Sequence, residues 1–296
     1  MNPTTVYLEQ ISHELNAILL QGKDGRNEDS LHHFFEKYPV ALLSAIGDAP
    51  ANYHIYCGCI ISKPNIKSLD GDRQPDFLIV TSNSLNLYFN FIEIESSDKK
   101  IFRTSDQSVT ADFSQAYNQL KQWSSFENDE IKSFCNDLLD SLFKDNYDSR
   151  TVKKHHYNYI LVYGSVEEIE NQGKRCNDIL QSYFEAKNLY HCTYSRIRNN
   201  IRFYPQLFTV RKEQKSNKYK AVGLVPIRHY GIDEWMNFHN ISGKSELIHQ
   251  TNLLADDEKK ILLEEIAHWD AKSYQQIHDE MFKNGLQIRN LSALKF

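Results

Sequence analysis

PDFLIVTSNSLNLYFNFIEIE, residues 75–95, contains two apolar runs joined by a short Ser/Asn turn. The runs PDFLIV and LYFNFIEIE are each long enough for a strand, and the residues between them are typical of a hairpin turn. Side chains on a strand alternate between the faces of a sheet, so Phe91, Glu93 and Glu95 are expected to share one face. Two glutamates beside apolar rings repel each other and lose hydration, which predicts a positive group at the end of the second strand.

The hairpin brings a third carboxylate to the same place. Asp76 opens the first strand, so antiparallel pairing puts it at the end of the second strand, which carries Glu93 and Glu95. Carboxylates and water are the ligands that Mg²⁺ prefers, so we predict a Mg²⁺ or Mn²⁺ site held by Asp76 and Glu93, with the carbonyl of Ile94 as a third candidate ligand. The chemistry expected there is metal-assisted phosphodiester hydrolysis, with Glu95 orienting or deprotonating the attacking water.

Two other interpretations of these carboxylates stay open. One is a solvated strand end whose carboxylates pair with Lys99 and Lys100. The other is a glycosidase, since Glu93 and Glu95 lie about 7 Å apart along an extended strand. The sequence shows no obvious aromatic platform for a sugar, which disfavours the glycosidase.

The composition is that of a globular protein. The chain has 296 residues, of which 41% are hydrophobic and 25% charged, and its net charge of −5 argues against a generally basic nucleic-acid binder. The five cysteines form no zinc pattern, and their odd number argues against a disulfide framework. No signal sequence and no run of about 20 apolar residues is visible, so we expect a cytoplasmic protein without a membrane segment.

The pattern along the chain predicts a mixed α/β fold. Further strands are expected at residues 53–61 and 155–165, and a second hairpin in FYPQLFTV and YKAVGLVPI. Helices are expected at 27–38, 107–126, 130–143 and 166–186. The predicted organisation is an N-terminal helix (1–26), a central domain (27–225) and a helical C-terminal extension (226–296).

Six segments, in this order, resemble the Shedu antiphage defence family: EDSLHHFFEKYPVALL from residue 28, PDFLIV, FIEIESSDKKIF, SQAYNQLKQW, HHYNYILVYGS and HCTYSRI. The resemblance spans about residues 28–211. Asp76 followed by Glu93 and Glu95 also resembles the PD-(D/E)xK nuclease fold, to which the Shedu nuclease domain belongs. The resemblance implies a restriction-endonuclease-like mixed sheet flanked by helices, and a homo-oligomer. Glu95 stands where most members of the fold have lysine, although some type II restriction endonucleases have glutamate there.

The resemblance also implies two further site residues. Nucleases of this fold commonly place a glutamine near the active site on the helix after the strand, and Gln119 matches that position. Gln115, Gln119 and Trp123 are spaced to line one face of that helix. Members of the fold often have a metal-linked glutamate on an early helix, where Glu28 is the candidate and Glu36 the competitor. A glutamate that only complements the helix start is the alternative for Glu28.

A positive zone interleaved with aromatic residues lies between residues 195 and 220 of this acidic chain, with Glu213 as its only acid. Clustered basic residues suit phosphate contacts. The residues expected to contact DNA are Arg196, Arg198, Arg202, Arg211 and Lys212. A solvated face of the second hairpin is the alternative. No recognition-helix pattern is present, so base-specific reading is not expected.

Together these features predict a metal-dependent DNA endonuclease of a Shedu-like antiphage defence system. The alternative is a catalytically inactive module of the same fold that binds DNA ends or a partner, because the usual lysine is missing from the second strand.

Overall fold

The computed structural model of the chain describes residues 3–21, 27–47, 49, 54–66, 74–124, 128–142, 153–186, 188–201, 204, 207–213, 218–225, 240–273, 275–276 and 279. Its strands are β1 (His54–Ser62), β2 (Phe77–Ser82), β3 (Asn86–Ile94), β4 (Lys154–Val162), β5 (Leu189–Cys192), β6 (Phe208–Lys212), β7 (Tyr219–Leu224) and β8 (Ile241–Ser242). Its helices are α1 (Pro3–Gln21), α2 (Glu28–Lys37), α3 (Pro39–Leu42), α4 (Ala111–Ser124), α5 (Asn128–Leu142), α6 (Val166–Asn171), α7 (Lys174–Tyr183), α8 (Tyr194–Asn199), α9 (Lys244–Gln250) and α10 (Asp256–Asp270).

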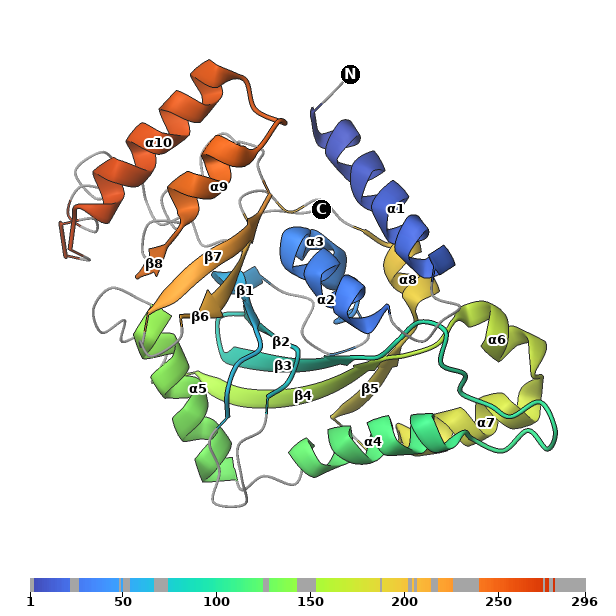
Figure 1. The fold of residues 1–296 in the computed structure, drawn as a ribbon. Helices are drawn as coiled ribbons and strands as arrows, with labels where there is room; N and C mark the ends of the chain where they lie inside the picture. Colours follow the sequence, from blue (N-terminus) through green and yellow to red (C-terminus); the bar gives the residue numbers. More distant parts are fainter. Residues whose placement is uncertain are drawn as a thin grey trace.

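The strands form one eight-stranded mixed sheet in the order β5-β4-β3-β2-β1-β6-β7-β8 (Figure 1). Strands β1, β3, β4, β5 and β6 run in one direction, whereas β2, β7 and β8 run in the opposite direction. The carboxyl ends of five strands and the start of β2 therefore lie at one edge of the sheet. This carboxyl edge is where ligands bind in open α/β sheets.

Both predicted hairpins form. In the first, β2 and β3 pair antiparallel with Phe77 opposite Ile92, and both strands are buried on both faces, which explains why their sequences are apolar almost without interruption. In the second, β6 and β7 pair antiparallel. The prediction of a mixed α/β fold is confirmed.

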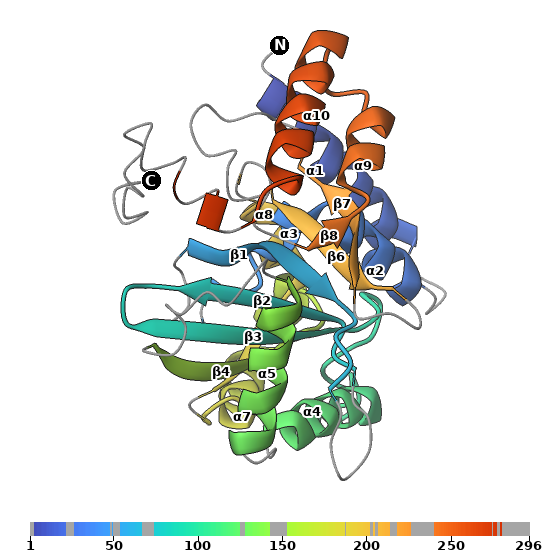
Figure 2. The same cartoon turned by 90° about the vertical axis from the view of Figure 1, so that its left-hand side faces the viewer.

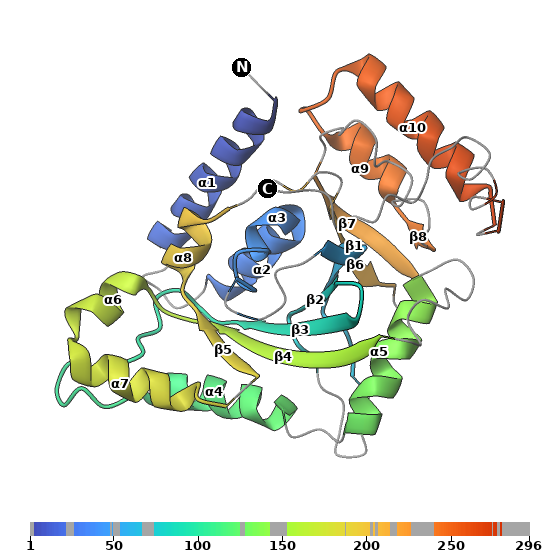
Figure 3. The same cartoon turned by 180° about the vertical axis from the view of Figure 1, so that it is seen from behind.

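Helices cover both faces of the sheet, as the views in Figures 2 and 3 show. On one face, side chains of α1, α2, α3 and α8 form a core with Phe77 and Ile92. On the other face, side chains of α4, α5 and α7 pack on Phe89 and Phe91. The alternation of side chains predicted for β3 is therefore observed, with Phe91 and Ile92 in different cores.

Two expected helices differ in the structure. The helix expected at 166–186 is divided into α6 and α7 at Gly173, whose φ of +80° lies in the left-handed region. The helix expected from residue 107 begins at Ala111, because the Thr110 hydroxyl accepts a hydrogen bond from Phe113 N at 3.1 Å and caps α4. Residues after β5 form the short helix α8, whose N-terminus Thr193 caps.

The helical extension expected at 226–296 contains a strand as well as helices in its described residues, which begin at residue 240. Strand β8 pairs parallel with β7 and becomes the last strand of the sheet, and α9 and α10 follow it. None of the helices within the described ranges has the length and apolar run that crossing a bilayer requires.

Candidate active site

The site lies at the carboxyl edge of the sheet, where β2 begins and β3 ends. Since Phe77 pairs with Ile92, Asp76 comes beside the end of β3. Its Oδ2 accepts a hydrogen bond from Ile94 N at 2.9 Å, the backbone amide between the two glutamates. The structure therefore brings Asp76 to the strand end that carries Glu93 and Glu95, as the hairpin predicted.

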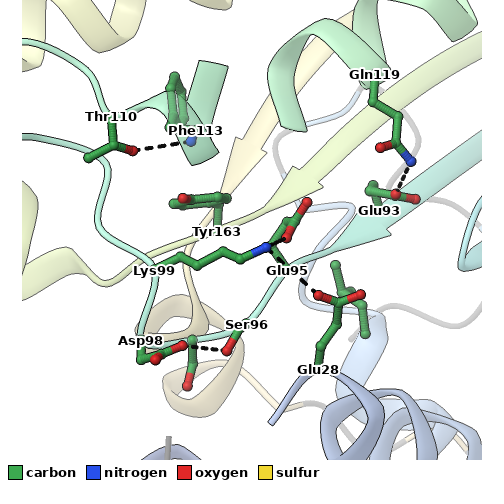
Figure 4. A network of polar contacts seen from close by, with 12 residues as sticks. Glu28, Glu93, Glu95, Ser96, Asp98, Lys99, Thr110, Phe113, Gln119 and Tyr163 are labelled. Atoms are coloured by element: carbon green, nitrogen blue, oxygen red, sulfur yellow. Dashed lines mark hydrogen bonds and ion pairs between the residues drawn. The ribbon is translucent and has the colours of Figure 1, made fainter. Parts of the chain in front are cut away.

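Glu93 is the most buried carboxylate of the three, with 7% of its surface exposed. Gln119 donates a hydrogen bond from Nε2 to Glu93 Oε1 (Figure 4). The other oxygen, Oε2, is buried and has no hydrogen-bond partner among the described residues. Burial, reinforced by the charges of Asp76 and Glu95, raises the pKa of Glu93 well above its ordinary value, although the backbone N–H of Asp76 opposes the rise. A proton or a cation on Oε2 would compensate the burial of this carboxylate.

Asp76 has a similar but milder perturbation. Burial raises its pKa to about 6, although the hydrogen bond from Ile94 N opposes the rise. The charge of Glu28 raises the pKa of Asp76 further, and that of Lys63 lowers it. Lys63 has a left-handed φ of 47°, unusual for a residue with a side chain, and its N–H donates to the Asp76 carbonyl at 2.8 Å.

Glu95 has a cationic partner. Lys99, four residues later, donates a hydrogen bond from Nζ to Glu95 Oε2, and the same Nζ lies 3.9 Å from Glu28 Oε2 (Figure 4). Burial alone would lower the pKa of Lys99, but the hydrogen bond and charge of Glu95, with the charges of Glu28 and Asp112, raise it. Lys99 is therefore a positive group at the end of β3. For Glu95, this contact agrees with the alternative interpretation in which the carboxylates pair with lysines.

Glu28 reaches the site because the start of α2 is tied to the loop after β3. Asn27, one residue before α2, accepts a hydrogen bond from Ser97 N at 3.1 Å on its Oδ1, which also accepts from the Ser96 hydroxyl. Burial and the charge of Glu95 raise the pKa of Glu28, which Lys99 opposes. Glu28 is thus an outer member of the same carboxylate cluster.

The competitor Glu36 belongs to a separate cluster. Its carboxylate accepts hydrogen bonds from the Arg211 guanidinium, with Arg211 Nε at 2.9 Å, and from the Ser62 hydroxyl. His32 lies 3.9 Å from the same oxygen and stacks on Phe77. Because these groups satisfy Glu36, it is not placed to serve the site of Asp76 and Glu93.

The carboxylates of Asp76 and Glu93 suit a hard divalent cation that takes only a few of its ligands from the protein. As the side chains stand, no group of three His, Cys, Asp or Glu residues in the described ranges is arranged to hold a metal ion. Mg²⁺ is usually held by one or two carboxylates and completes its shell with water and substrate phosphates. Asp76 and Glu93, with the unsatisfied Glu93 Oε2, fit that pattern, whereas Oε2 of Glu95 accepts a hydrogen bond from Lys99.

Gln119 stands beside the site on α4, and its neighbours form a polar depression of about 620 Å³. The lining residues are Ala111, Ser114, Gln115, Asn118, Gln119 and Gln122. Trp123 is instead buried in the core, so the helix face predicted to hold Gln115, Gln119 and Trp123 is divided between the groove and the interior. This groove adjoins the carboxylates through Gln119, which contacts Glu93.

The residues predicted to contact DNA lie on different elements. Arg196 and Arg198 are on α8, where Arg198 is 3.5 Å from Glu167 Oε1. Arg211 and Lys212 end β6, and Arg211 is bound to Glu36 while Lys212 is exposed. Arg202 lies outside the described residues.

The aromatic residues interleaved with this zone do not all reach the surface. Tyr194, Phe208 and Tyr219 are buried in the cores and are not available to stack on bases. Tyr194 instead donates a hydrogen bond from its hydroxyl to the Glu95 carbonyl. It therefore supports the backbone of the site from α8, a role that the sequence did not indicate.

Residues 25–197 match the family model described as Shedu protein SduA, C-terminal. A search of curated proteins finds no match. The matched range includes Asp76, Glu93, Glu95 and Gln119, and it covers more than half of the chain.

Proposed function

The chain belongs to the Shedu protein SduA family, and from this premise we propose that it is a metal-dependent DNA endonuclease that hydrolyses phosphodiester bonds. Membership of the family supports a role in antiphage defence. The single observation that carries the proposed activity is the crowded carboxylate pair of Asp76 and Glu93. The buried Glu93 Oε2 has no hydrogen-bond donor in the described part of the chain, and a divalent cation meets that need. The same proposal assigns the sheet to the PD-(D/E)xK nuclease class.

The proposed roles follow from the contacts. A bound Mg²⁺ or Mn²⁺ supplies Lewis-acid polarisation of the scissile phosphate. Asp76 and Glu93 would hold the cation, and Glu28 is an additional candidate from the outer side of the cluster. Glu95 orients the attacking water and accepts its proton. Gln119 fixes the Glu93 carboxylate through the hydrogen bond from its amide to Oε1, which would leave Oε2 available to a cation.

The proposed substrate is DNA held through its phosphates. Lys212 is exposed, and Arg196 and Arg198 lie on α8, directly after β5 at the carboxyl edge that also carries the carboxylates. Contacts of this kind position the duplex without reading sequence. We also propose that the protein acts as a homo-oligomer in the cytoplasm.

The proposal is tested by nicking of supercoiled plasmid with Mg²⁺, comparing the wild type with Glu93→Gln. The amide keeps an acceptor for Gln119 but removes the charge. The matched control is Glu170→Gln, an exposed carboxylate on α6. We expect nicking by the wild type and the control, and a loss of at least about 100-fold for Glu93→Gln, as expected when a residue essential to charge stabilisation is removed.

Equal activity of all three proteins would overturn the nuclease proposal. If none nicks the plasmid but all three shift DNA in a gel, the catalytically inactive binding module is the correct interpretation.

A further inference from the structure

Lys99 supplies a cation beside the carboxylates at the end of β3. It follows β3 on a loop, yet its Nζ returns to the carboxylates of Glu95 and Glu28. About a third of its side chain, 32%, is exposed, so Lys99 lies between the cluster and the solvent. A phosphate arriving at the carboxylates from outside therefore meets this ammonium group.

The loop that carries Lys99 is anchored by a buried carboxylate, that of Glu168. Glu168 on α6 accepts hydrogen bonds on Oε1 from Ile101 N at 2.8 Å and Phe102 N at 3.1 Å. The Thr110 hydroxyl donates to the Lys100 carbonyl at 2.6 Å. These bonds fix the backbone on the carboxyl-terminal side of Lys99.

The other side of the loop is fixed as well. Ser96 and Ser97 bind Asn27 at the start of α2. The backbone of Lys99 itself donates to the Ser96 carbonyl at 3.2 Å. Anchors on both sides place the ammonium group with little freedom of the main chain, which is the condition for a preorganised electrostatic contact.

Burial of Glu168 indicates that its contact with the loop is specific. Only 9% of its surface is exposed, and an isolated buried carboxylate is costly unless hydrogen-bond donors compensate it. Its own N–H donates to Ser165 Oγ at 3.2 Å, which places it in the first turn of α6, where the helix dipole also favours a negative charge. The Glu168 carboxylate accepts hydrogen bonds from two backbone amides of the Lys99 loop rather than from its own helix.

We propose, on the basis of the nuclease function proposed above, that Lys99 is a catalytic residue that donates a hydrogen bond to a non-bridging oxygen of the scissile phosphate, and that Glu168 is the positioning residue that holds its loop. Lys99 stabilises the negative charge that grows on the phosphate as water attacks. The attacking water gives its proton to Glu95 as its oxygen bonds to phosphorus. The bond from phosphorus to the leaving sugar oxygen breaks, and that oxygen takes a proton from solvent water, so Lys99 keeps its charge throughout.

A purely structural role for Lys99 makes a different prediction. If Lys99 only neutralises Glu95 and Glu28, its removal lowers the free energy of unfolding and leaves the turnover of folded protein unchanged. Catalysis and stability therefore have to be measured on the same variants.

The test uses plasmid nicking at saturating Mg²⁺ with Lys99→Ala, Lys99→Arg and the neighbouring exposed Lys100→Ala as a matched control, beside urea unfolding of each. We expect kcat to fall by about 100-fold for Lys99→Ala, to recover at least about tenfold of that loss for Lys99→Arg, and to change less than about twofold for Lys100→Ala. Wild-type kcat in folded Lys99→Ala would overturn the role of Lys99 and leave the nuclease function standing. Absence of nicking by the wild type would overturn both.

Glu168 is tested with Glu168→Ala and Glu168→Gln, because the amide oxygen still accepts from both N–H groups. We expect about a 100-fold loss of kcat for Glu168→Ala, since a misplacement of about 1 Å has effects of that size, and a loss below about tenfold for Glu168→Gln. Hydrogen exchange at Ile101 and Phe102 should accelerate in Glu168→Ala only. Equal kcat of the two variants, or accelerated exchange with unchanged kcat, would overturn the positioning role.

Discussion

Replacing Asp76 by Asn tests the crowding of carboxylate charges at the site through protein stability, and the proposed catalysis through nicking activity. The side chains have nearly the same shape, and the amide oxygen still accepts the hydrogen bond from Ile94 N, which Asp76 accepts at 2.9 Å. The substitution removes only the charge that crowds Glu93. We expect a protein that folds normally, has lost its nicking activity and has a changed dependence of stability on pH.

The magnitude follows from the raised pKa of Asp76, about 6 in the folded protein against an ordinary value of 3.8. A carboxyl group whose pKa is raised by folding stabilises the protein while it is protonated, below pH 3.8, and this stabilisation is lost as the pH rises through 6. The full shift corresponds to ~3 kcal/mol at 1.36 kcal/mol per pH unit, and ~2 kcal/mol of it is lost between pH 4.5 and 7.5.

The assay is urea unfolding in EDTA at pH 4.5 and 7.5 for the wild type and Asp76→Asn. We take the difference in free energy of unfolding, variant minus wild type, at each pH. We expect this difference to be ~2 kcal/mol larger at pH 7.5 than at pH 4.5, so that the variant gains stability relative to the wild type as the pH rises. Saturating Mg²⁺ should then stabilise the wild type, by about 2.7 kcal/mol at a hundred times the Kd, and have no comparable effect on the variant.

A relative stability that is the same at both pH values would refute the reasoning. It would mean that the Asp76 carboxylate is not crowded in the folded protein, and the case for a cation at this position would lose its electrostatic basis.

Two further predictions concern single side chains. Arg211→Ala leaves the buried Glu36 without its guanidinium partner, so it should lower the free energy of unfolding by about 2–3 kcal/mol, less than for a fully buried pair because Arg211 is partly exposed. The control Lys212→Ala should change the free energy of unfolding by less than about 0.5 kcal/mol. Equal effects of the two substitutions in urea unfolding would contradict the ion pair. Gln119→Ala should lower the nicking rate about tenfold, because it removes one hydrogen bond to Glu93. Gln115→Ala, in the same groove, should leave the nicking rate nearly unchanged. Equal rates for the two variants would exclude a role for the contact between Gln119 and Glu93.

The hairpin and its carboxylates could be predicted from local sequence. Apolar runs joined by a polar turn specify antiparallel neighbours, and that pairing alone brings Asp76 beside Glu93. The burial of β2 and β3 on both faces agrees with their nearly continuous apolar sequence. Local pattern and strand geometry were sufficient because the partners are less than 20 residues apart.

The surroundings of the carboxylates depend on contacts between distant segments. Glu168 and Ile101 are 67 residues apart, Asn27 and Ser96 are 69 apart, and Arg211 and Glu36 are 175 apart. No periodicity reports such contacts. The pairing of Arg211 with Glu36 shows the consequence, because a run of basic residues in the sequence does not reveal which charges an acid from another helix already binds.

The most direct measurement is anomalous diffraction from crystals of the wild-type protein grown with Mn²⁺. The proposed function predicts one anomalous peak in contact with the carboxylates of Asp76 and Glu93, and its loss in crystals of Asp76→Asn. A map without a peak at these two side chains, in crystals where Mn²⁺ is present at saturating concentration, would contradict a metal-dependent site at the end of β3.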